Sequence, residues 1–449
     1  MTSKLYLKNG LIVNEGRIFK GGILIDGEII SDIIDYSVGH SVSGDVMTVD
    51  LEGLHVFPGV IDSHVHFREP GMTHKGDIAS ESKAAIAGGV TSVIEMPNTI
   101  PQTTSLKSLD DKIKIAENNS LVNYAFYLGA TNSNIDQLTS ADPSYIPGIK
   151  VFMGASTGDM LVDDQDSLIE IFNKVKSLIA VHCEDEKIIQ RNLLQAKKEY
   201  GDDIPFGLHP QIRSSEACYK SSLKAVSLAL KYQARLHLLH ISTEREIDLF
   251  YDLPCDSAKQ VTAEVCVHHL LFTDDDYNKK QSFIKWNPAI KSHADRVALR
   301  NSLNTNKIDI VSTDHAPHSV EEKKQPYLSC PSGAPMIQHS LEAMLDLYHE
   351  KVISLETIAE KMCHNPARCF NIKDRGFIRK GFIADLAIVN LNMDWKIEKE
   401  NILYKCKWSP LEGRVLKSKV IHTFVNGRHV YNSGVIDGSK SGKLLSFSK

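Results

Sequence analysis

The sequence predicts an α/β protein, a (β/α)8 TIM-type barrel with a small β-sandwich domain built from both chain termini. Three observations support this fold class. Eight apolar segments alternate with helical patterns through the middle of the chain, and both ends consist of short alternating segments with Asn-Gly, Gly-Gly and Asp-Gly turns. The 449 residues also suffice for a large core and a second domain. We expect a composite β domain at 1–57 plus 372–449 and the barrel at 58–371.

The barrel elements follow one another in a regular order of strand and helix. The predicted strands are short apolar runs at 56–64, 90–96, 123–128, 148–153, 179–182, 235–240, 261–267 and 308–313. The predicted helices are 75–87, 105–118, 161–177, 214–232 and 294–303, and Gly88-Gly89 marks the end of the first. This alternation indicates a barrel of parallel strands surrounded by helices.

Both ends of the chain are predicted to form β-strands. The N-terminal candidates are 4–7, 11–13, 22–25 and 28–33. The C-terminal candidates are 385–390, 420–425 and 429–431, and the last two flank an Asn426-Gly427 turn. We expect the two ends to pair with each other beside the barrel, and the polar stretch 439–449 to be loose.

The composition excludes several functional classes. The net charge is −5, so the chain lacks the basic excess that nucleic-acid binding needs. It contains no apolar run of about 18 residues and no basic, then apolar, leader at its N-terminus. The eight cysteines form no Cys-x-x-Cys pair, which favours reduced thiols. We therefore expect a soluble, cytoplasmic protein that acts on a small molecule, with no nucleic-acid or membrane partner.

The stretch from Asp62 to Pro70 contains the first candidate metal ligands. His64 and His66 follow an apolar run and precede a Pro-Gly break, so they lie at the end of a predicted strand. Side chains at i and i+2 of a strand project from the same face, so both imidazoles could bind one ion. A His-x-His sequence alone also has a structural explanation, so the other strand ends must be considered.

The remaining strand ends supply further candidate ligands. Lys150 lies among large apolar residues, where its pKa should fall and its neutral amine could add carbon dioxide to form a carbamate. His182, His240 and Asp314 end the fifth, sixth and eighth strands. Each has a structural alternative: a surface lysine, buried core histidines, or an aspartate that caps a helix. Together the six side chains could hold two divalent ions roughly 3.5–4 Å apart.

Two motifs in this chain resemble the signatures of dihydroorotases, within the amidohydrolase superfamily. One runs from Asp62 to Pro70, and the other comprises Thr313 to His318 followed by Lys323. The segments 95–99, 263–270 and 287–290 support the resemblance, which covers about residues 1–440. It implies a dizinc site with His64, His66 and Asp314 on one ion, His182 and His240 on the other, and a bridging carboxylate; other divalent metals could replace zinc.

The chain departs from the family pattern at two positions. Many bacterial relatives carry an aspartate just beyond the fourth strand, where this chain has Met153-Gly154-Ala155. We therefore assign the bridge to a carbamate on Lys150, as in the hydantoinase branch, and keep Asp159 as a weaker substitute. The second departure is Ser312, where glycine or alanine is usual; this small change in volume puts little in doubt.

The resemblance also implies a substrate that carries a carboxylate. The guanidinium of Arg68 could bind a carboxylate through two parallel hydrogen bonds, and Asn98 could complete this binding site. The alternatives are that Arg68 forms a surface salt bridge and that Asn98 is only a turn residue. A cyclic ureide with a carboxylate fits, namely dihydroorotate. The implied substrate-binding residues are His66, Arg68, Asn98, Asn287, His318, Ser332 and Gly333.

The implied reaction is the reversible cyclisation of N-carbamoyl-L-aspartate to L-dihydroorotate plus water, a step of de novo pyrimidine (UMP) biosynthesis. In the hydrolytic direction, a hydroxide that bridges the two zinc ions attacks the ring amide, and Asp314 acts as general base and then general acid. Ring closure consumes a proton, so acid should favour it. Dimers are common among the resembling proteins, and a homodimer is therefore possible.

Two rival functions remain open from the sequence. The first is a hydantoinase or allantoinase, which is a cyclic amidase with the same metals and a different substrate ring. Arg68 and Asn98 argue against this function, because a substrate ring without a carboxylate leaves a buried guanidinium unpaired. The second is a catalytically silent barrel that binds a partner enzyme, but such a protein should have lost a ligand. The loop 154–158 could close over the substrate as a lid or be a plain surface loop.

Overall fold

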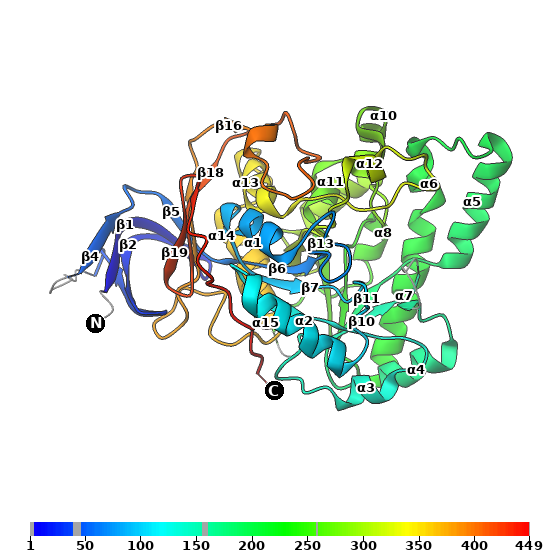
Figure 1. Ribbon diagram of the computed structural model, residues 1–449, viewed down its shortest axis with the longest axis horizontal. Coiled ribbons are helices and arrows are strands. Elements are labelled where there is room, and N and C mark those ends of the chain that lie inside the picture. The colour runs from blue at the N-terminus through cyan, green and yellow to red at the C-terminus, as the bar shows by residue number, and fades with distance from the viewer. Residues whose placement is uncertain (1–3, 39–45, 155–159, 257–258, 449) are drawn as a thin grey trace.

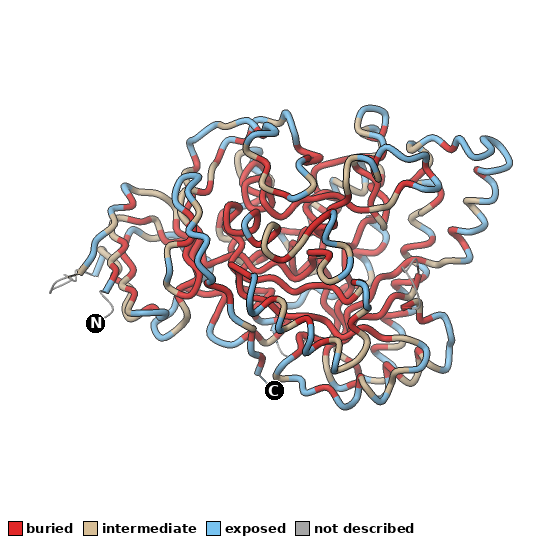
Figure 2. Tube along the Cα trace, in the orientation of Figure 1, coloured by how far each residue is buried: buried red, intermediate tan, exposed pale blue. Residues whose placement is uncertain are grey.

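The computed structural model describes residues 4–38, 46–154, 160–256 and 259–448. It contains a barrel of parallel strands and helices, with a β domain at one side of it (Figure 1). The fold class predicted from the sequence is confirmed. The barrel strands form a buried centre, whereas α5 projects from the opposite side of the molecule with an exposed surface (Figure 2).

The barrel strands occupy eight positions, and every strand position matches a predicted apolar run. They are β6 (Val60–Val65), β7 (Val90–Glu95), β8 (Asn123–Phe126) continued by β9 (Leu128–Gly129), β10 (Ile149–Phe152), β11 (Ile179–His182), β12 (Leu236–Leu238), β13 (Val261–Cys266) and β14 (Ile310–Ser312). Neighbouring strands are parallel. Closure follows from a parallel bridge between Val65 and His315. All of these strand residues are buried, as expected for parallel strands covered by helices.

The first predicted strand, 56–64, is in fact two strands. β5 (His55–Pro58) belongs to the β domain, and β6 belongs to the barrel. The chain changes sheet at Gly59, where a Cβ atom would lie 2.1 Å from the Thr91 Oγ1 atom. A continuous apolar run does not reveal this change of partner, because both strands are buried.

The helices surround the barrel. Each helix predicted from the sequence is present, and its ends lie within a few residues of the predicted ends. The largest difference is at 161–177, where only α4 (Gln165–Lys174) is helical. The helices are α1 (Ile78–Ala87), α2 (Leu106–Asn119), α3 (Ile135–Ser140), α4 (Gln165–Lys174), α5 (Glu186–Tyr200), α6 (His209–Ile212), α7 (Ser215–Tyr232), α8 (Glu244–Ile247), α9 (Val267–Leu271), α10 (Tyr277–Lys280), α11 (His293–Ser302), α12 (Val320–Lys323), α13 (Ser340–His349), α14 (Leu355–Ala359) and α15 (Asn365–Cys369). None of the helices in the described part of the chain is long and apolar enough to cross a membrane. All eight cysteines are free thiols, as predicted.

The β domain is built around one nine-stranded sheet that joins both ends of the chain. β5 pairs with β1 on one side and, antiparallel, with β15 on the other. The strands are β1 (Leu5–Asn14), β2 (Arg17–Asp26), β3 (Ile29–Asp35), β4 (Met47–Asp50), β5, β15 (Leu386–Asn390), β18 (Lys419–Val425), β19 (Arg428–Asn432) and β20 (Val435–Ile436). A separate two-stranded sheet contains β16 (Trp395–Lys396) and β17 (Val415–Leu416). The predicted pairing of the two ends is therefore confirmed.

Two of the predicted N-terminal turns are absent. Asn9 and Gly10 lie inside β1, where the pairing with β2 shifts by a bulge between Leu7 and Gly10. The Gly-Gly pair lies inside β2. Glycine can mark either a turn or a bulge, and here the long strand allows more backbone hydrogen bonds. The Asn426-Gly427 turn is present, with positive φ at both residues.

The C-terminal segment is packed, which contradicts the prediction that 439–449 is loose. Leu445 and Phe447 are each 1% exposed and belong to the same apolar cluster as Ile94 and Ile310 of the barrel strands. The backbone N–H of Tyr124 also donates to the Lys443 carbonyl at 3.0 Å. The few apolar residues in this polar stretch therefore anchor it against the barrel.

We expect Phe447→Ala to lower the free energy of unfolding by about 3–5 kcal/mol, because it removes a fully buried ring. The shift of the urea unfolding midpoint measures this effect. Ser448→Ala is the matched control, since the Ser448 side chain is exposed and its backbone hydrogen bond remains. Equal midpoints for the two variants would show that the packing of the Phe447 ring contributes no stability.

Candidate active site

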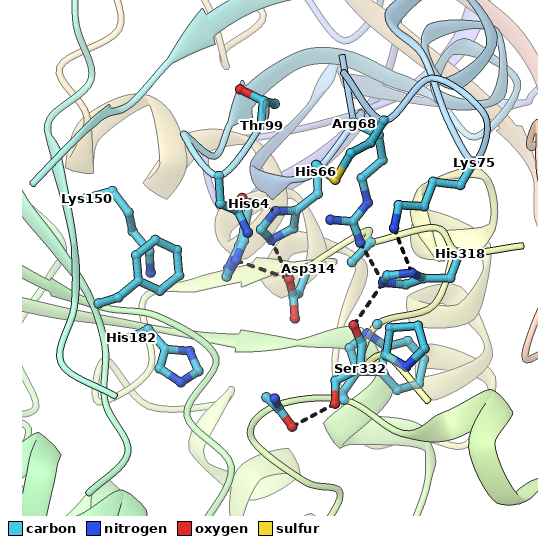
Figure 3. Close-up of a pocket in the computed structure, with 18 of the residues that line it drawn as sticks. His64, His66, Arg68, Lys75, Thr99, Lys150, His182, Asp314, His318 and Ser332 are labelled. Atoms are coloured by element: carbon cyan, nitrogen blue, oxygen red, sulfur yellow. Dashed lines mark hydrogen bonds and ion pairs between the residues drawn. The ribbon is translucent and has the colours of Figure 1, made fainter. Parts of the chain in front are cut away.

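A cavity of about 610 Å³ lies at the C-terminal ends of the barrel strands. This is the face on which barrel enzymes carry their active sites. Figure 3 shows side chains from several strands and loops directed towards one another there. All twelve residues that the sequence predicts for the site line this cavity: His64, His66, Arg68, Asn98, Lys150, His182, His240, Asn287, Asp314, His318, Ser332 and Gly333.

His64, His66 and Asp314 converge on one point of the cavity. The Oδ1 atom of Asp314 lies 3.2 Å from the Nε2 atom of His64 and 3.0 Å from the Nε2 atom of His66. The ligand atoms of the three side chains lie within 4.8 Å of one another, and all three residues are buried. Burial raises the pKa of Asp314, but the neighbouring His64 and His66 lower it by more, so the pKa lies below the usual value of an aspartate. Asp314 is therefore ionised at neutral pH.

The two histidines are oriented by hydrogen bonds from their other ring nitrogens. The Nδ1 atom of His64 donates to Glu264 at 2.6 Å, and that of His66 donates to the amide oxygen of Asn98 at 2.8 Å. An imidazole whose only proton is on Nδ1 presents the lone pair of Nε2, and both Nε2 atoms lie beside the Oδ1 atom of Asp314. Three acceptors that face one another repel unless a proton or a metal cation lies between them. This arrangement fits a metal ion.

His182 and His240 form a second pair of ring nitrogens. The Nδ1 atom of His182 lies 2.8 Å from the Nε2 atom of His240. The other nitrogen of His182 donates to Glu184 at 3.0 Å, and Glu184 also forms an ion pair with Arg213. The lone pair on Nδ1 of His182 is therefore directed at His240, so a proton or a second cation must lie between the rings.

Lys150 lies on β10 next to these ligands and is 1% exposed. Its Nζ atom lies 4.3 Å from the centre of the Phe152 ring, and no described residue forms a hydrogen bond with it. Burial lowers the pKa of Lys150 to about 7, so much of the amine is neutral at neutral pH, as predicted. The alternative bridge Asp159 and the predicted lid residues 155–158 lie outside the described residues.

Three site residues adopt the left-handed backbone conformation. The φ angles are 70° at Arg68, 40° at His240 and 47° at Asp314. Such angles cost about 1–3 kcal/mol for residues other than glycine, and they gather at functional sites. Each residue lies at or just after the end of a barrel strand, so the chain turns sharply where the side chain enters the cavity.

Arg68 and His318 form the positively charged end of the cavity. Arg68 is 6% exposed; its Nε atom donates to the Pro317 carbonyl at 3.1 Å, and its Nη2 atom lies 3.0 Å from Nε2 of His318. Burial lowers the pKa of Arg68 to about 10, which still leaves it charged. No described carboxylate forms an ion pair with Arg68, so its surface salt-bridge alternative is excluded within the described chain.

The loop that follows α12 completes the cavity wall. The Ser332 hydroxyl donates to the side-chain oxygen of Asn287 at 3.0 Å, and the Gly333 N–H donates to the Lys285 carbonyl at 2.8 Å. Lys323 is completely buried and donates to the carbonyls of Pro331 and Gly333, both at 2.9 Å. The loop around Ser332 is therefore held by the buried Lys323, whose side-chain amine donates to two of its backbone carbonyls.

The sequence reasoning assigned no role to Glu264 and Lys75. Glu264 lies in an apolar strand, and a carboxylate there needs a partner, so its position was a usable signal. Its carboxylate contacts both His64 and His237. Lys75 lines the cavity and lies 3.2 Å from Nδ1 of His318. Nothing in its polar surroundings distinguishes it in the sequence from a surface lysine.

The barrel and its converging histidine and aspartate side chains are typical of barrel hydrolases whose active sites bind metal ions. Residues 55–430 match the model of the amidohydrolase family, and the chain belongs to this family. The predicted assignment to the cyclic amide hydrolases of this superfamily is thereby confirmed as an enzyme class.

Known proteins similar to this chain cover almost its whole length. The dihydroorotase of Methanosphaera stadtmanae is 30% identical over 426 residues, which are 95% of this chain and 96% of that protein. The allantoinase of Desulfitobacterium hafniense is 30% identical over 451 residues, 98% of either protein. The structure of L-hydantoinase (dihydropyrimidinase) from Arthrobacter aurescens has a TM-score of 0.91 and 28% identity, and covers 99% of this chain and 100% of that chain. The resemblance to dihydroorotases is confirmed, and the relatives differ in their named activities.

Proposed function

We propose that this protein is a dihydroorotase, which interconverts N-carbamoyl-L-aspartate and L-dihydroorotate. The observation that carries the proposal is Arg68, a buried guanidinium that faces the cavity without a carboxylate partner in the described chain. A buried charge of this kind needs a partner, and the carboxylate of the substrate supplies it. The amide nitrogen of Asn98 also makes no hydrogen bond to a described residue and remains available as a donor.

The residues around Asp314 and His182 would hold two zinc ions, or other divalent ions. His64, His66 and Asp314 would bind one, His182 and His240 the other, and a carbamate on Lys150 would bridge them. Bound ions would polarise the ring amide and acidify the attacking water. The low pKa of the Lys150 amine supports the carbamate, because carbon dioxide adds to a neutral amine.

Asp314 performs the proton transfers in the proposed reaction. Its ionised carboxylate accepts a proton from the attacking water and then donates it to the ring nitrogen as the amide C–N bond breaks. In the reverse direction one water leaves and one proton is consumed, so lower pH favours ring closure. Arg68 binds the carboxylate that is present in both the ring and the open form, and so holds the amide in place.

A second candidate is a hydantoinase or allantoinase, because such proteins are among the similar sequences and structures. It would leave the Arg68 guanidinium without a carboxylate partner. A catalytically silent scaffold is less well supported, since every predicted ligand lines the cavity. A homodimer and a cytoplasmic location stay predictions.

Steady-state assays of the zinc-loaded protein test the proposal. We expect turnover of L-dihydroorotate and N-carbamoyl-L-aspartate to the same equilibrium mixture, with more ring closure at lower pH. Dihydrouracil, hydantoin and allantoin, which lack the carboxylate, should show much lower kcat/KM. A preference for one of these three would support the second candidate, and metal-loaded protein that turns over none of the five would support the scaffold.

Arg68→Met should lower kcat/KM for L-dihydroorotate at least about 10²-fold, because two charge-assisted hydrogen bonds are lost. Activity towards a ring without a carboxylate should fall much less. Arg191→Met is the control, since Arg191 is an exposed arginine outside the cavity. An equal loss on both kinds of substrate would show that Arg68 does not recognise the carboxylate.

A further inference from the structure

Lys75 is a buried cation that the proposed reaction does not yet use. It lies in the loop between β6 and α1, is 7% exposed and lines the cavity. Its Nζ atom lies 3.2 Å from Nδ1 of His318 and 3.0 Å from the carboxylate of Glu322. Figure 3 shows Lys75 and Arg68 approaching the His318 ring from different directions.

The loop that carries Lys75 is held in place at both ends. Gly71 has a φ of 87°, and a Cβ atom there would lie 2.0 Å from the Ile100 carbonyl oxygen, so only glycine fits. The carboxylate of Glu69 accepts from the N–H of Ile78 at the start of α1, at 3.0 Å. The Lys75 N–H donates to the Met72 carbonyl at 3.2 Å. The fold therefore determines the position of the Lys75 backbone, and Glu322 holds its ammonium group.

The His318 ring has four polar neighbours but only one ring proton. Burial and the positive charges of Arg68 and Lys75 hold the pKa of His318 well below its usual value, so the ring is neutral at pH 7. Nδ1 faces the donor Lys75 and, at 3.4 Å, the acceptor Glu322. Nε2 faces the donor Arg68 at 3.0 Å and the carbonyl of Ser332 at 3.1 Å.

Two tautomers are possible, and they leave Arg68 in different states. If Nδ1 accepts from Lys75, the proton is on Nε2 and is donated to Ser332, so the Nη2 atom of Arg68 needs another acceptor. If Nδ1 donates to Glu322, Nε2 accepts from Arg68, and one of the two N–H groups of Nη2 is already used. The tautomer thus decides whether both N–H groups of Nη2 are available to a ligand.

The contacts of Nδ1 favour the first tautomer, whereas Nε2 has a donor and an acceptor at nearly equal distances, Arg68 at 3.0 Å and Ser332 at 3.1 Å. The ammonium group of Lys75 is a charged donor at 3.2 Å, whereas the Glu322 oxygen that faces Nδ1 is 3.4 Å away. That oxygen already accepts from the N–H of Ser319 at 2.8 Å, as part of the cap of α12. Glu322 accepts from Lys75 with its other oxygen. Its carboxylate therefore holds Lys75 rather than the His318 proton.

We propose that Lys75 is a specificity-determining positioning residue, which fixes the His318 proton on Nε2 and so leaves Nη2 of Arg68 for the carboxylate of a cyclic ureide. This inference rests on the proposed function and deepens it. Arg68 and Lys75 together carry two positive charges and Glu322 one negative charge, which leaves one positive charge to match a single carboxylate. Lys75 acts through His318 and does not itself touch the reacting atoms.

Lys75→Met and Lys75→Arg, with Lys83→Met as the control, test this inference. Lys83 is an exposed lysine on α1. In zinc-loaded Lys75→Met we expect KM for L-dihydroorotate to rise at least about tenfold and kcat to change less than about threefold. Orotate should bind at least about tenfold more weakly, whereas the binding of uracil should be unchanged. Lys75→Arg should keep most of the parent protein's affinity for orotate and a KM close to the parent value, because arginine is also a charged donor.

Nitrogen-15 NMR of the histidine ring nitrogens separates the two tautomers directly. Under the proposal the His318 proton is on Nε2 in the parent protein and is no longer confined to Nε2 in Lys75→Met. A His318 proton on Nδ1 in the parent protein, or a Lys75→Met variant with unchanged orotate binding and KM, would overturn the inference. If the parent protein neither binds orotate nor turns over dihydroorotate, the proposed function itself has failed.

Discussion

Asp314→Asn should lower kcat for L-dihydroorotate by about 10²–10⁴-fold, the contribution typical of a general acid–base group. The neutral amide cannot accept the proton of the attacking water, although it keeps the size and shape of the carboxylate. The expected loss follows from the position of Asp314, whose Oδ1 atom lies within 3.2 Å of both His64 and His66. Steady-state assays at saturating substrate measure it.

The metal content of this variant separates the two roles of Asp314. Mass-spectrometric metal analysis should accompany each assay, because the same carboxylate is a proposed ligand. A variant that keeps two ions and loses turnover supports the general base. Near-normal turnover with the metal bound would show that another group transfers the proton.

Lys150→Arg should lose more than about 10²-fold in activity and bind one zinc ion instead of two. Arginine keeps the positive charge and a similar length, but its guanidinium does not form a carbamate. The Nζ atom of Lys150 has no hydrogen-bond partner in the described chain, so the substitution breaks no ion pair that could explain the loss. Metal analysis and dihydroorotate turnover are the two measurements.

Lys150→Ala provides a further control for the same residue. It opens space at the site, and short carboxylic acids such as acetate should restore part of the second ion and of the activity by replacing the carbamate. Lys176→Ala, at an exposed lysine, should behave as the parent protein. Two bound ions and full activity in Lys150→Arg would rule out the carbamate bridge.

The order of the barrel elements could be predicted from the sequence, because the spacing of apolar residues and the residues that start and end helices are local features. The sequence did not predict where the chain changes from one sheet to the other, since the run around Gly59 is buried in both. The packing of Leu445 and Phe447 was also missed, because two apolar side chains in a polar stretch give no periodic signal. Tertiary contacts, rather than local preference, determine both features.

The candidate site was predictable to the extent that its residues stand at strand ends in recognisable motifs. His64, His66, Lys150, His182, His240 and Asp314 all line one cavity. What the sequence could not show is the partner of each side chain: Glu264 orients His64 across the barrel, and Lys75 reaches His318 from another loop. The positive φ angles at His240 and Asp314 were likewise invisible, since neither residue type requires them.

A crystal structure of the zinc-loaded protein with bound dihydroorotate tests the central claim most directly. We predict one anomalous peak among His64, His66 and Asp314, a second at His182 and His240, and continuous density from the Lys150 amine to both ions. The carboxylate of the ligand should accept hydrogen bonds from Arg68. Ions bound at other residues, or a ligand whose carboxylate points away from Arg68, would contradict the account.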